Sequence, residues 1–397
     1  MAKIAILNSV YNLGSTGRIC FDLSNELIDS GFEVKVFYGR NNQNLPHSFY
    51  FGTKLDNYWH GFMTRLTGKH GLYSKSRTKM LLKELNKYNA DMFVLNNLHG
   101  YYINYEILFD YLSKQNKPVI WIFHDCWPFT GHCAHFSYYG CQKWKTDCKS
   151  CPYRFTYPAS FFACNSQKNF SAKKESFLKV EKLSIVCPSL WLADLVKQSF
   201  FSGKEVRVIN NGINEKVFQK KKITQFRKKY GLEDKKLILC VSYVFNKRKG
   251  FSDIIEISKR LNDSERIVVV GKIKNGKIPQ NIIHIERTDN VDELVDIYSS
   301  CDVLFNPTYE DNYPTVNLEA VSCSLPVVCY RTGGAPESVD SRYVVEQGDI
   351  NKSYELMHSI FSNPSTYVFK QDLQLSMNYT FKQYKALIDE ILLKDSE

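Results

Sequence analysis

Acidic, proline and glycine residues that could do chemistry are concentrated in residues 306–337, which read NPTYEDNYPTVNLEAVSCSLPVVCYRTGGAPE. An apolar run over residues 303–305 predicts a strand, and the loop after it carries Glu310 and Asp311. Pro314 then fits the first position of a helix. The free amides and the positive dipole end of that helix suit a phosphate group. We therefore predict a ligand site here; the alternative is that the acidic side chains of this stretch are ordinary surface carboxylates.

A basic cluster is the second candidate for binding an anion. Lys247, Arg248 and Lys249 form an uninterrupted run between a predicted strand over residues 237–244 and a helix that opens after Gly250. Such a run by itself is usually a solvated patch. Open parallel sheets, however, bind their ligands at the carboxyl ends of the strands, which is where this run falls. We therefore predict that Arg248 and Lys249 bind phosphate.

Four of the twelve cysteines lie close together in an aromatic and basic segment, residues 127–157. Their spacing is Cys133-x7-Cys141-x6-Cys148-x2-Cys151. Four thiolates suit a tetrahedral zinc ion that braces a loop, and His132 and His135 are nearby alternative ligands. Unligated thiols and disulfides are the other two interpretations, although a reducing compartment disfavours disulfides. Because four thiolates would close the coordination sphere, we expect any zinc here to be structural.

Aromatic and basic residues are interleaved in residues 58–79, which read YWHGFMTRLTGKHGLYSKSRTK. A segment of this composition could contact an anionic membrane face or a lipid-diphosphate carrier. The alternative is a loop followed by the N-terminus of a helix.

The elements that must position these residues alternate between strand and helix patterns along nearly the whole chain. Predicted strands of the first half cover residues 4–7, 33–37, 92–95, 119–123, 183–187 and 206–209, with a helix over 16–29. In the second half, strands are predicted over 237–244, 267–270, 282–285, 303–305 and 326–330, and helices over 251–261, 291–301 and 315–323. This alternation predicts an α/β protein with two doubly wound parallel sheets.

The turn-forming residues Asn-Asn-Gly at positions 210–212 predict the boundary between the two domains. We expect an N-terminal domain over residues 1–210 and a C-terminal domain over 211–379. The helical pattern over 380–393 has no strand after it. We expect this last helix to pack back onto the first domain.

Composition limits the classes of protein that fit. The chain has 397 residues, of which 44% are hydrophobic and 23% charged, so it is neither disordered nor a disulfide scaffold. The apolar runs are far shorter than the roughly 20 residues that span a bilayer. The N-terminal residues favour a first strand over a signal peptide, so we expect a cytosolic protein. A formal charge of +11 favours anionic partners.

The order and spacing of several motifs resemble family 4 of the retaining, nucleotide-sugar-dependent glycosyltransferases. The resemblance is carried by Asp311-x7-Glu319, by Ser-Leu-Pro-Val at 324–327 and by Thr-Gly-Gly-Ala-Pro-Glu at 332–337. Weaker matches are the first loop with Gly14 and Gly17, and residues 96–100, 124–125, 188–189, 209–213 and 248–250. The family has the GT-B fold, so the resemblance implies two Rossmann-like domains that face a central cleft.

The resemblance also implies roles for residues of the second domain. Glu319 would bind the ribose hydroxyls of the donor, and Asp311 or Glu310 the hydroxyls of the transferred sugar. The family usually has Glu at both ends of the seven-residue gap, so either of those two carboxylates is a candidate. Arg248 and Lys249 would clamp the diphosphate, and Arg248 is a substitute for an arginine that the family often has at the position of Val244.

The remaining implied roles concern helper groups and metals. Backbone amides near Thr315 and Gly17 would assist the diphosphate clamp, with Gly14 in the same first loop. His124 would lie beside the anomeric centre and donate to a sugar hydroxyl; a buried structural histidine is the alternative. The chain contains no Asp-x-Asp sequence, so we expect chemistry without a catalytic metal. The only metal we consider is the structural zinc.

The sequence therefore favours an enzyme that moves a sugar from a nucleotide-diphosphate donor to a saccharide or a lipid-linked saccharide in cell-surface polysaccharide synthesis. We expect peripheral contact with the inner membrane face and no nucleic acid partner. The first alternative is a nicotinamide-dependent oxidoreductase, but the first loop has Gly14-x-x-Gly17 instead of Gly-x-Gly-x-x-Gly. The second is a nucleic-acid binder, which lacks a recognition motif here.

Overall fold

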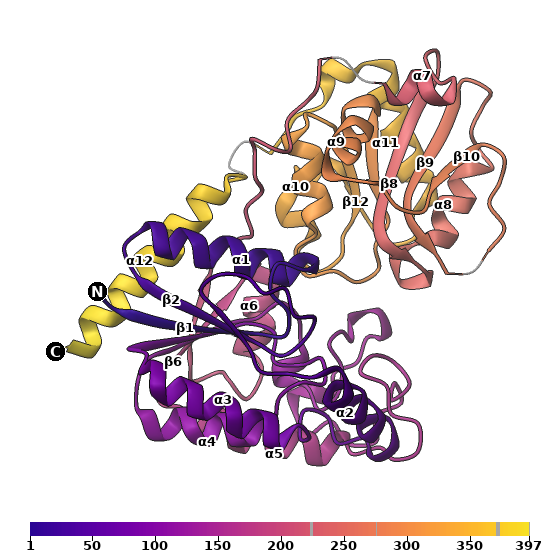
Figure 1. Ribbon diagram of the computed structural model, residues 1–397. Coiled ribbons are helices and arrows are strands. Elements are labelled where there is room, and N and C mark those ends of the chain that lie inside the picture. Colours follow the sequence, from indigo (N-terminus) through magenta and orange to yellow (C-terminus); the bar gives the residue numbers. More distant parts are fainter. Residues whose placement is uncertain (223–224, 275, 371–373, 397) are drawn as a thin grey trace. The chain divides into compact units, whose positions relative to one another are not determined.

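The computed structural model describes residues 1–222, 225–274, 276–370 and 374–396. The chain forms two compact units, each with its own hydrophobic core. Unit 1 contains Met1–Ile209 and, after the chain returns to it, Phe381–Glu397; unit 2 contains Asn210–Thr380. The returning segment is the C-terminal helix drawn in yellow in Figure 1.

Unit 1 is built on a seven-stranded sheet in the order β3-β2-β1-β4-β5-β6-β7. Every neighbouring pair in this sheet is parallel. The strands are β1 Lys3–Asn8, β2 Glu33–Tyr38, β3 Ser48–Tyr50, β4 Met92–Leu95, β5 Val119–Ile122, β6 Leu183–Cys187 and β7 Glu205–Val208. The central strands β4, β5 and β6 are buried along their whole length because helices cover both faces of the sheet.

The helices of unit 1 are α1 Gly14–Asp29, α2 Lys54–Thr67, α3 Lys75–Tyr88, α4 Tyr105–Gln115, α5 Ser166–Leu178, α6 Leu190–Lys197 and the C-terminal helix α12 Met377–Ser396. Figure 1 shows α3, α4 and α5 together on one side of the sheet and α1 on the other. Between β5 and α5 the chain has only three short 3-10 turns, η1 Trp127–Phe129, η2 Ser137–Tyr139 and η3 Lys143–Lys145. This long segment therefore has little regular structure of its own.

Unit 2 has a six-stranded parallel sheet in the order β10-β9-β8-β11-β12-β13. Its strands are β8 Lys236–Phe245, β9 Glu265–Ile273, β10 Ile282–Ile285, β11 Val303–Asn306, β12 Val327–Tyr330 and β13 Val344–Val345. Its helices are α7 Phe226–Tyr230, α8 Phe251–Ser258, α9 Val291–Ser300, α10 Thr315–Ser322 and α11 Ile350–Ser362. Short 3-10 turns cover η4 Lys247–Lys249, η5 Ala335–Ser338, η6 Ser341–Tyr343 and η7 Pro364–Thr366.

Each sheet has one point at which the strand order reverses, and the loops there define where a ligand can bind. In unit 1 this point lies between β1 and β4, and in unit 2 between β8 and β11. Chain connections leave such a point in opposite directions, which opens a crevice at the carboxyl ends of the two strands. The predicted α/β class with two doubly wound parallel sheets is confirmed.

Two local predictions differ from the structure. Pro314 is not the first residue of α10 but the residue before it, because Thr315 is the first that continues the helical backbone. The aromatic and basic segment over residues 58–79 is not a loop before a helix. Its first ten residues complete α2, a short turn follows, and its last five begin α3.

The C-terminal helix α12 carries side chains that contact unit 1. Arg207 of β7 donates to Glu390 at 3.1 Å, and Lys182 pairs with Asp395. Lys385 lies over the ring of Phe32 at 5.8 Å from its centroid. Among the described residues, no helix is long and apolar enough to cross a membrane.

Candidate active site

The loop after β8 holds the basic cluster of unit 2. Asn246 directly follows the strand, and its side-chain oxygen accepts the backbone N–H of Lys249 at 3.1 Å, which caps the 3-10 turn η4. Gly250 follows with a φ of +68°. A Cβ at this glycine would lie 2.1 Å from the carbonyl oxygen of Pro307, so glycine allows the loop to approach the end of β11.

The basic cluster of unit 2 contacts the acidic loop that follows β11. Lys249 Nζ lies 2.5 Å from Asp311 Oδ2, and about a fifth of each side chain is exposed. Arg248 Nη1 donates to the backbone oxygen of Glu310 at 3.2 Å and lies 3.9 Å from its Oε2. The Glu310 side chain is only 2% exposed. Two cations and two carboxylates, far apart in the sequence, therefore meet at the carboxyl ends of β8 and β11.

A backbone hydrogen bond fixes the two loops of this cluster to one another. The amide of Tyr309 donates to the carbonyl of Arg248 at 2.9 Å. Behind it, the hydroxyls of Tyr309 and Tyr330 both donate to the same oxygen of Asp253 at 2.7 Å. The polar groups at the end of the sheet are thus held by hydrogen bonds among the loops after β8 and β11, strand β12 and helix α8, which restricts the positions that Arg248 and Lys249 can take.

Helix α10 brings Glu319 to this part of unit 2. Its first turn begins at Thr315, and Asn317 is held by Asn306 of β11 at 2.9 Å and by Ser338 of η5 at 3.0 Å. Glu319 is half-buried, and its Oε2 accepts the hydroxyl of Tyr298 on α9 at 2.7 Å. Burial and the adjacent Glu319 carboxylate hold the pKa of Tyr298 well above its usual range, so the tyrosine donates this bond throughout the physiological pH range.

The histidine predicted to lie at the reaction centre, His124, lies two residues after the end of β5 in unit 1. Its Nε2 lies 3.0 Å from Oδ1 of Asn96, which follows the neighbouring strand β4. Burial lowers the pKa of His124 to about 4. The imidazole is therefore neutral near pH 7, and a neutral imidazole can offer one N–H donor.

Beside His124 lies a second polar group, formed by His99 and Asp125, whose residues belong to the motif matches of the sequence but were given no role there. His99 Nε2 lies 2.6 Å from Asp125 Oδ2, and its Nδ1 lies 3.1 Å from the hydroxyl of Tyr157. Burial opposes the charge on Asp125, but His99 and the Trp127 amide outweigh it and lower the pKa of that carboxyl to about 2. The available signal was the position of His99 and Asp125 in the loops that follow the neighbouring strands β4 and β5.

The glycines of the first loop lie at the same edge of the unit 1 sheet. Gly14 begins α1 with a φ of +65°, and the amide of Asn12 donates to the carbonyl of Gly17 at 2.9 Å. Oδ1 of Asn8, at the end of β1, accepts the amide of Asn97 at 3.1 Å. The loops after β1 and β4 are therefore joined at the point where the strand order reverses.

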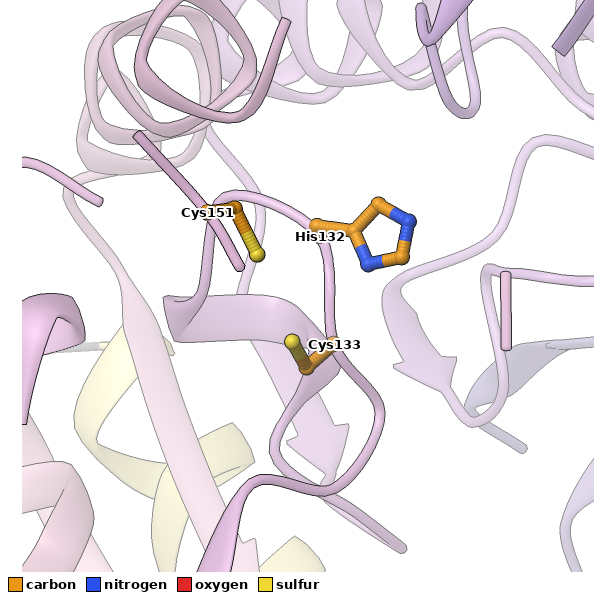
Figure 2. Close-up of side chains that lie close together, drawn as sticks. All are labelled: His132, Cys133 and Cys151. Carbon is orange, nitrogen blue, oxygen red and sulfur yellow. The ribbon is translucent and has the colours of Figure 1, made fainter. Parts of the chain in front are cut away.

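The four cysteines of the predicted zinc site line one cavity, in the segment between β5 and α5. Ligand atoms of His132, Cys133 and Cys151 lie within 4.8 Å of one another, as Figure 2 shows. A hydrogen bond from Cys133 lowers the pKa of the Cys151 thiol to about 6. The described residues thus bring a soft-metal ligand set together, whereas His135 is outside this group.

The structure places most of the predicted donor-site residues at the carboxyl edge of a sheet. Unit 2 brings Arg248, Lys249, Glu310 and Asp311 into contact, and Thr315 begins the adjoining helix α10, on which Glu319 contacts Tyr298. Unit 1 gathers the first-loop glycines and His124 near Asn96. The roles given to these residues stay predictions.

Two family models match the chain. The model described as Glycosyltransferase Family 4 matches residues 16–217, and the model described as Glycosyl transferases group 1 matches residues 222–378. The first match covers half of the chain by itself, and together the two cover most of both units.

Individual relatives are more distant. A protein of Escherichia coli K12 named for colanic acid biosynthesis, WcaC, is 26% identical over 60% of each chain. The N-acetyl-alpha-D-glucosaminyl L-malate synthase of Bacillus anthracis is 27% identical over 37% of this chain and 42% of that one. The matched region therefore spans less than two thirds of the length of these relatives.

Solved structures resemble the fold over almost the whole chain. HepE of Anabaena, solved in complex with UDP-glucose, has a TM-score of 0.67 and covers 98% of this chain and 100% of its own. The sequence identity is 12%. WaaG, described as a glycosyltransferase involved in lipopolysaccharide biosynthesis, has a TM-score of 0.62 at 14% identity and covers 95% of this chain and 93% of its own. The fold is that of GT-B glycosyltransferases.

Proposed function

Since this chain belongs to glycosyltransferase family 4, we propose that it moves a sugar, with retention, from a nucleotide-diphosphate donor to a saccharide or lipid-linked saccharide in cell-surface polysaccharide synthesis. The observation that carries the proposal is the contact of Arg248 and Lys249 with the Glu310–Asp311 loop at the point of strand reversal in unit 2. The complex of HepE with UDP-glucose and the name of WcaC support the choice of donor and process.

Unit 2 is the proposed donor-binding unit. Negative charge grows on the departing nucleotide diphosphate in the transition state, and fixed cations at that position stabilise it. Lys249 and Arg248 supply these cations, and the first-turn amides of α10 near Thr315 add donors. In the structure Asp311 pairs with Lys249, so an arriving diphosphate competes with Asp311 for the ammonium group. The freed carboxylate is then available to a hydroxyl of the sugar.

The carboxylates of unit 2 have separate proposed tasks. Glu319 accepts hydrogen bonds from the ribose hydroxyls, and the Tyr298 hydroxyl fixes its orientation. Asp311 is the better candidate for the transferred sugar because its side chain is ten times more exposed than the 2% exposed Glu310. Glu310 instead orients Arg248.

The reaction is proposed to need no metal ion. An oxocarbenium-like transition state demands charge stabilisation on the leaving group. The chain has no Asp-x-Asp sequence to hold a divalent cation, and it has two basic side chains at the carboxyl edge of the unit 2 sheet. We name no general base. Neutral His124 has a single N–H, which Asn96 Oδ1 accepts from Nε2 in this structure, so a sugar hydroxyl that takes this N–H must displace Asn96.

Unit 1 is the proposed acceptor-binding unit, and α2 its proposed membrane contact. Four apolar residues at helical spacing are exposed along α2: Leu55, Tyr58, Trp59 and Phe62. Lys54, Arg65 and Lys69 lie at its two ends. An exposed aromatic face with basic neighbours favours the surface of an anionic membrane. Sedimentation with vesicles that contain phosphatidylglycerol tests this contact, and a Trp59→Ser/Phe62→Ser variant that sediments equally well would refute it.

The donor proposal is tested by incubating the full chain with a panel of sugar nucleotides and detecting the released nucleoside diphosphate. We expect one or two donors to be hydrolysed slowly without acceptor, with or without a chelator of divalent cations. Turnover of a nicotinamide cofactor, with every sugar nucleotide inert, would instead support the oxidoreductase alternative.

A further inference from the structure

We propose that unit 1 binds one structural zinc ion through the thiolates of Cys133, Cys141, Cys148 and Cys151, which all line the cavity between β5 and α5. The inference is independent of the proposed transfer reaction. It joins two observations on the described residues: the shared cavity and the approach of ligand atoms within it.

Cys133 and Cys151 have their sulfur atoms close to one another. Figure 2 shows their sulfur atoms pointing toward one another from two separate stretches of the segment. These atoms and a ring nitrogen of His132 lie within 4.8 Å of one another, which is close to the separation of ligands around one tetrahedral ion. No bond between cysteines is present among the described residues, and each of the four is a free thiol.

The turn over residues 148–151 is shaped to present two sulfurs on one side. Cys148 and Ser150 both have a φ of +53°, a backbone conformation that is uncommon outside glycine. Lys143 Nζ donates to the carbonyls of Lys149 and Ser150 at 3.1 and 2.9 Å, which holds this conformation. The amide of Gly131 donates to Cys148 Sγ at 3.2 Å. Amide donors of this kind stabilise a thiolate in the position of a metal ligand.

His132 is an unusual member of the cavity lining. Its side chain is buried, and neither ring nitrogen has a hydrogen-bond partner. Buried polar atoms without a partner are rare in folded proteins. We nevertheless assign the ion to four sulfurs. Figure 2 shows the ring of His132 extending away from the side on which the sulfurs of Cys133 and Cys151 approach each other. Four soft thiolates also match the structural sites that zinc prefers.

The proposed ion has a structural consequence for the polar group beside His124. The segment from β5 to α5 has only three short 3-10 turns, yet it carries Tyr157, whose hydroxyl lies 3.1 Å from His99. At its other side, Lys173 of α5 donates to the carbonyls of Trp127 and Thr130. A zinc ion joins three parts of this segment and so fixes the loop that places Tyr157 against His99.

The first experiment measures metal content in the full chain, purified without a histidine tag and without chelators. Inductively coupled plasma mass spectrometry should find about one zinc per chain after dialysis. Replacement by Co²⁺ should give the sulfur-to-cobalt charge-transfer bands and the d–d bands of a tetrahedral thiolate site. Zinc removal should also open the segment to trypsin at its basic residues Lys143, Lys145, Lys149 and Arg154.

Single variants assign the ligands. Stoichiometric zinc binding should be lost in each of four variants: Cys133→Ser, Cys141→Ser, Cys148→Ser and Cys151→Ser. Cys164→Ser is the matched control, because this exposed thiol lies near the segment but does not line the cavity, and it should retain zinc. His132→Ala should also retain zinc. If the serine variants fail to fold, the cobalt spectrum of the unaltered protein still tests whether a tetrahedral thiolate site is present.

Three results would overturn the proposal. One is a metal-free chain that gives no tetrahedral cobalt spectrum. Another is a native chain whose mass rises by two hydrogens on reduction, which would reveal a disulfide among these cysteines. The third is loss of zinc in His132→Ala with zinc retained in Cys141→Ser, which would refute the four-sulfur ligand set. None of these measurements depends on whether the chain transfers a sugar.

Discussion

The carboxyl edges of the two sheets have the same architecture but different chemistry. In unit 2, the edge holds charged groups in pairs: Lys249 with Asp311 and Arg248 with Glu310. In unit 1, it holds a neutral, half-buried His124 and a His99–Asp125 pair in contact with aromatic rings. A parallel sheet with a strand-order reversal thus provides the location of a site, and the side chains after each strand decide what the site can bind. This comparison suggests a diphosphate for unit 2 and sugar hydroxyls for unit 1.

The largest effect should follow from removing the ammonium group of unit 2. Lys249→Ala should lower kcat/KM for sugar transfer by roughly 10²–10³, because the diphosphate loses a fixed charge in the transition state. Lys259→Ala is the matched control, since this exposed lysine pairs with Glu256 on the surface of α8. Equal activity in the two variants would show that Lys249 does not act in the site. It would also contradict the proposed electrostatic difference between the two units.

The second prediction separates binding from chemistry in unit 2. Glu319→Gln should raise the KM for the donor by roughly tenfold or more with a smaller change in kcat, because a ribose contact is remote from the bond that breaks. Tyr298→Phe removes the hydrogen bond to Glu319 and keeps the carboxylate. This variant should also raise the KM for the donor, but by less than Glu319→Gln does. A kcat effect larger than the KM effect would place Glu319 at the reacting centre.

The third prediction concerns the buried pair of unit 1. Asp125→Asn removes the carboxylate that pairs with His99 at 2.6 Å and accepts the amide of Trp127 at 2.9 Å. We expect roughly a tenfold loss of transfer, since His99 and the neighbouring His124 lose their fixed surroundings. Donor hydrolysis without acceptor should change less than transfer. Equal losses in both assays would contradict the separate tasks of the two units.

Comparison of sequence and structure shows which features of the fold a pattern can reveal. Strands such as β4 and β6 lie where their apolar runs predict, because strands covered on both faces read as largely apolar segments. Helix α2 was missed, since its aromatic residues lie on the exposed side, where a pattern gives no signal of burial. The two-residue strand β13 is too short to produce a pattern.

The candidate site was only partly predictable for a related reason. Lys249 and Asp311 were both selected, but their contact across 62 residues depends on the pairing of β8 with β11, which the sequence does not state. His99 was missed as a partner of Asp125 because the pair is formed by loops after neighbouring strands, 26 residues apart. The sequence thus indicated which residue types belong to the site. Which of them contact one another could be predicted only once the order of strands in each sheet was known.

The last prediction concerns stability and rests on two histidines of unit 1. Burial lowers the pKa of His60 to about 3 and that of His124 to about 4, below the value of about 6.5 for an exposed histidine. Between pH 6.5 and 4 the unfolded chain therefore binds protons that the folded chain does not. The free energy of unfolding should fall as pH falls through this window, by up to about 1.4 kcal/mol per pH unit for each histidine.

Urea denaturation at a series of pH values, followed by the fluorescence of the buried tryptophans of unit 1, measures this slope. His60→Leu should reduce it, because the substitution removes one of the groups that must take up a proton on unfolding. An unchanged slope would show that His60 is not held in its neutral form by the fold.

The central claim is that unit 2 binds a nucleoside diphosphate through Lys249 and Arg248, and isothermal titration calorimetry tests it most directly. Nucleoside diphosphates should be titrated into the unaltered protein and into Lys249→Ala, with a chelator present. We predict that one of them binds the unaltered protein and that Lys249→Ala binds it at least tenfold more weakly. Binding of equal strength to both proteins, or no binding of any nucleoside diphosphate, would contradict the account.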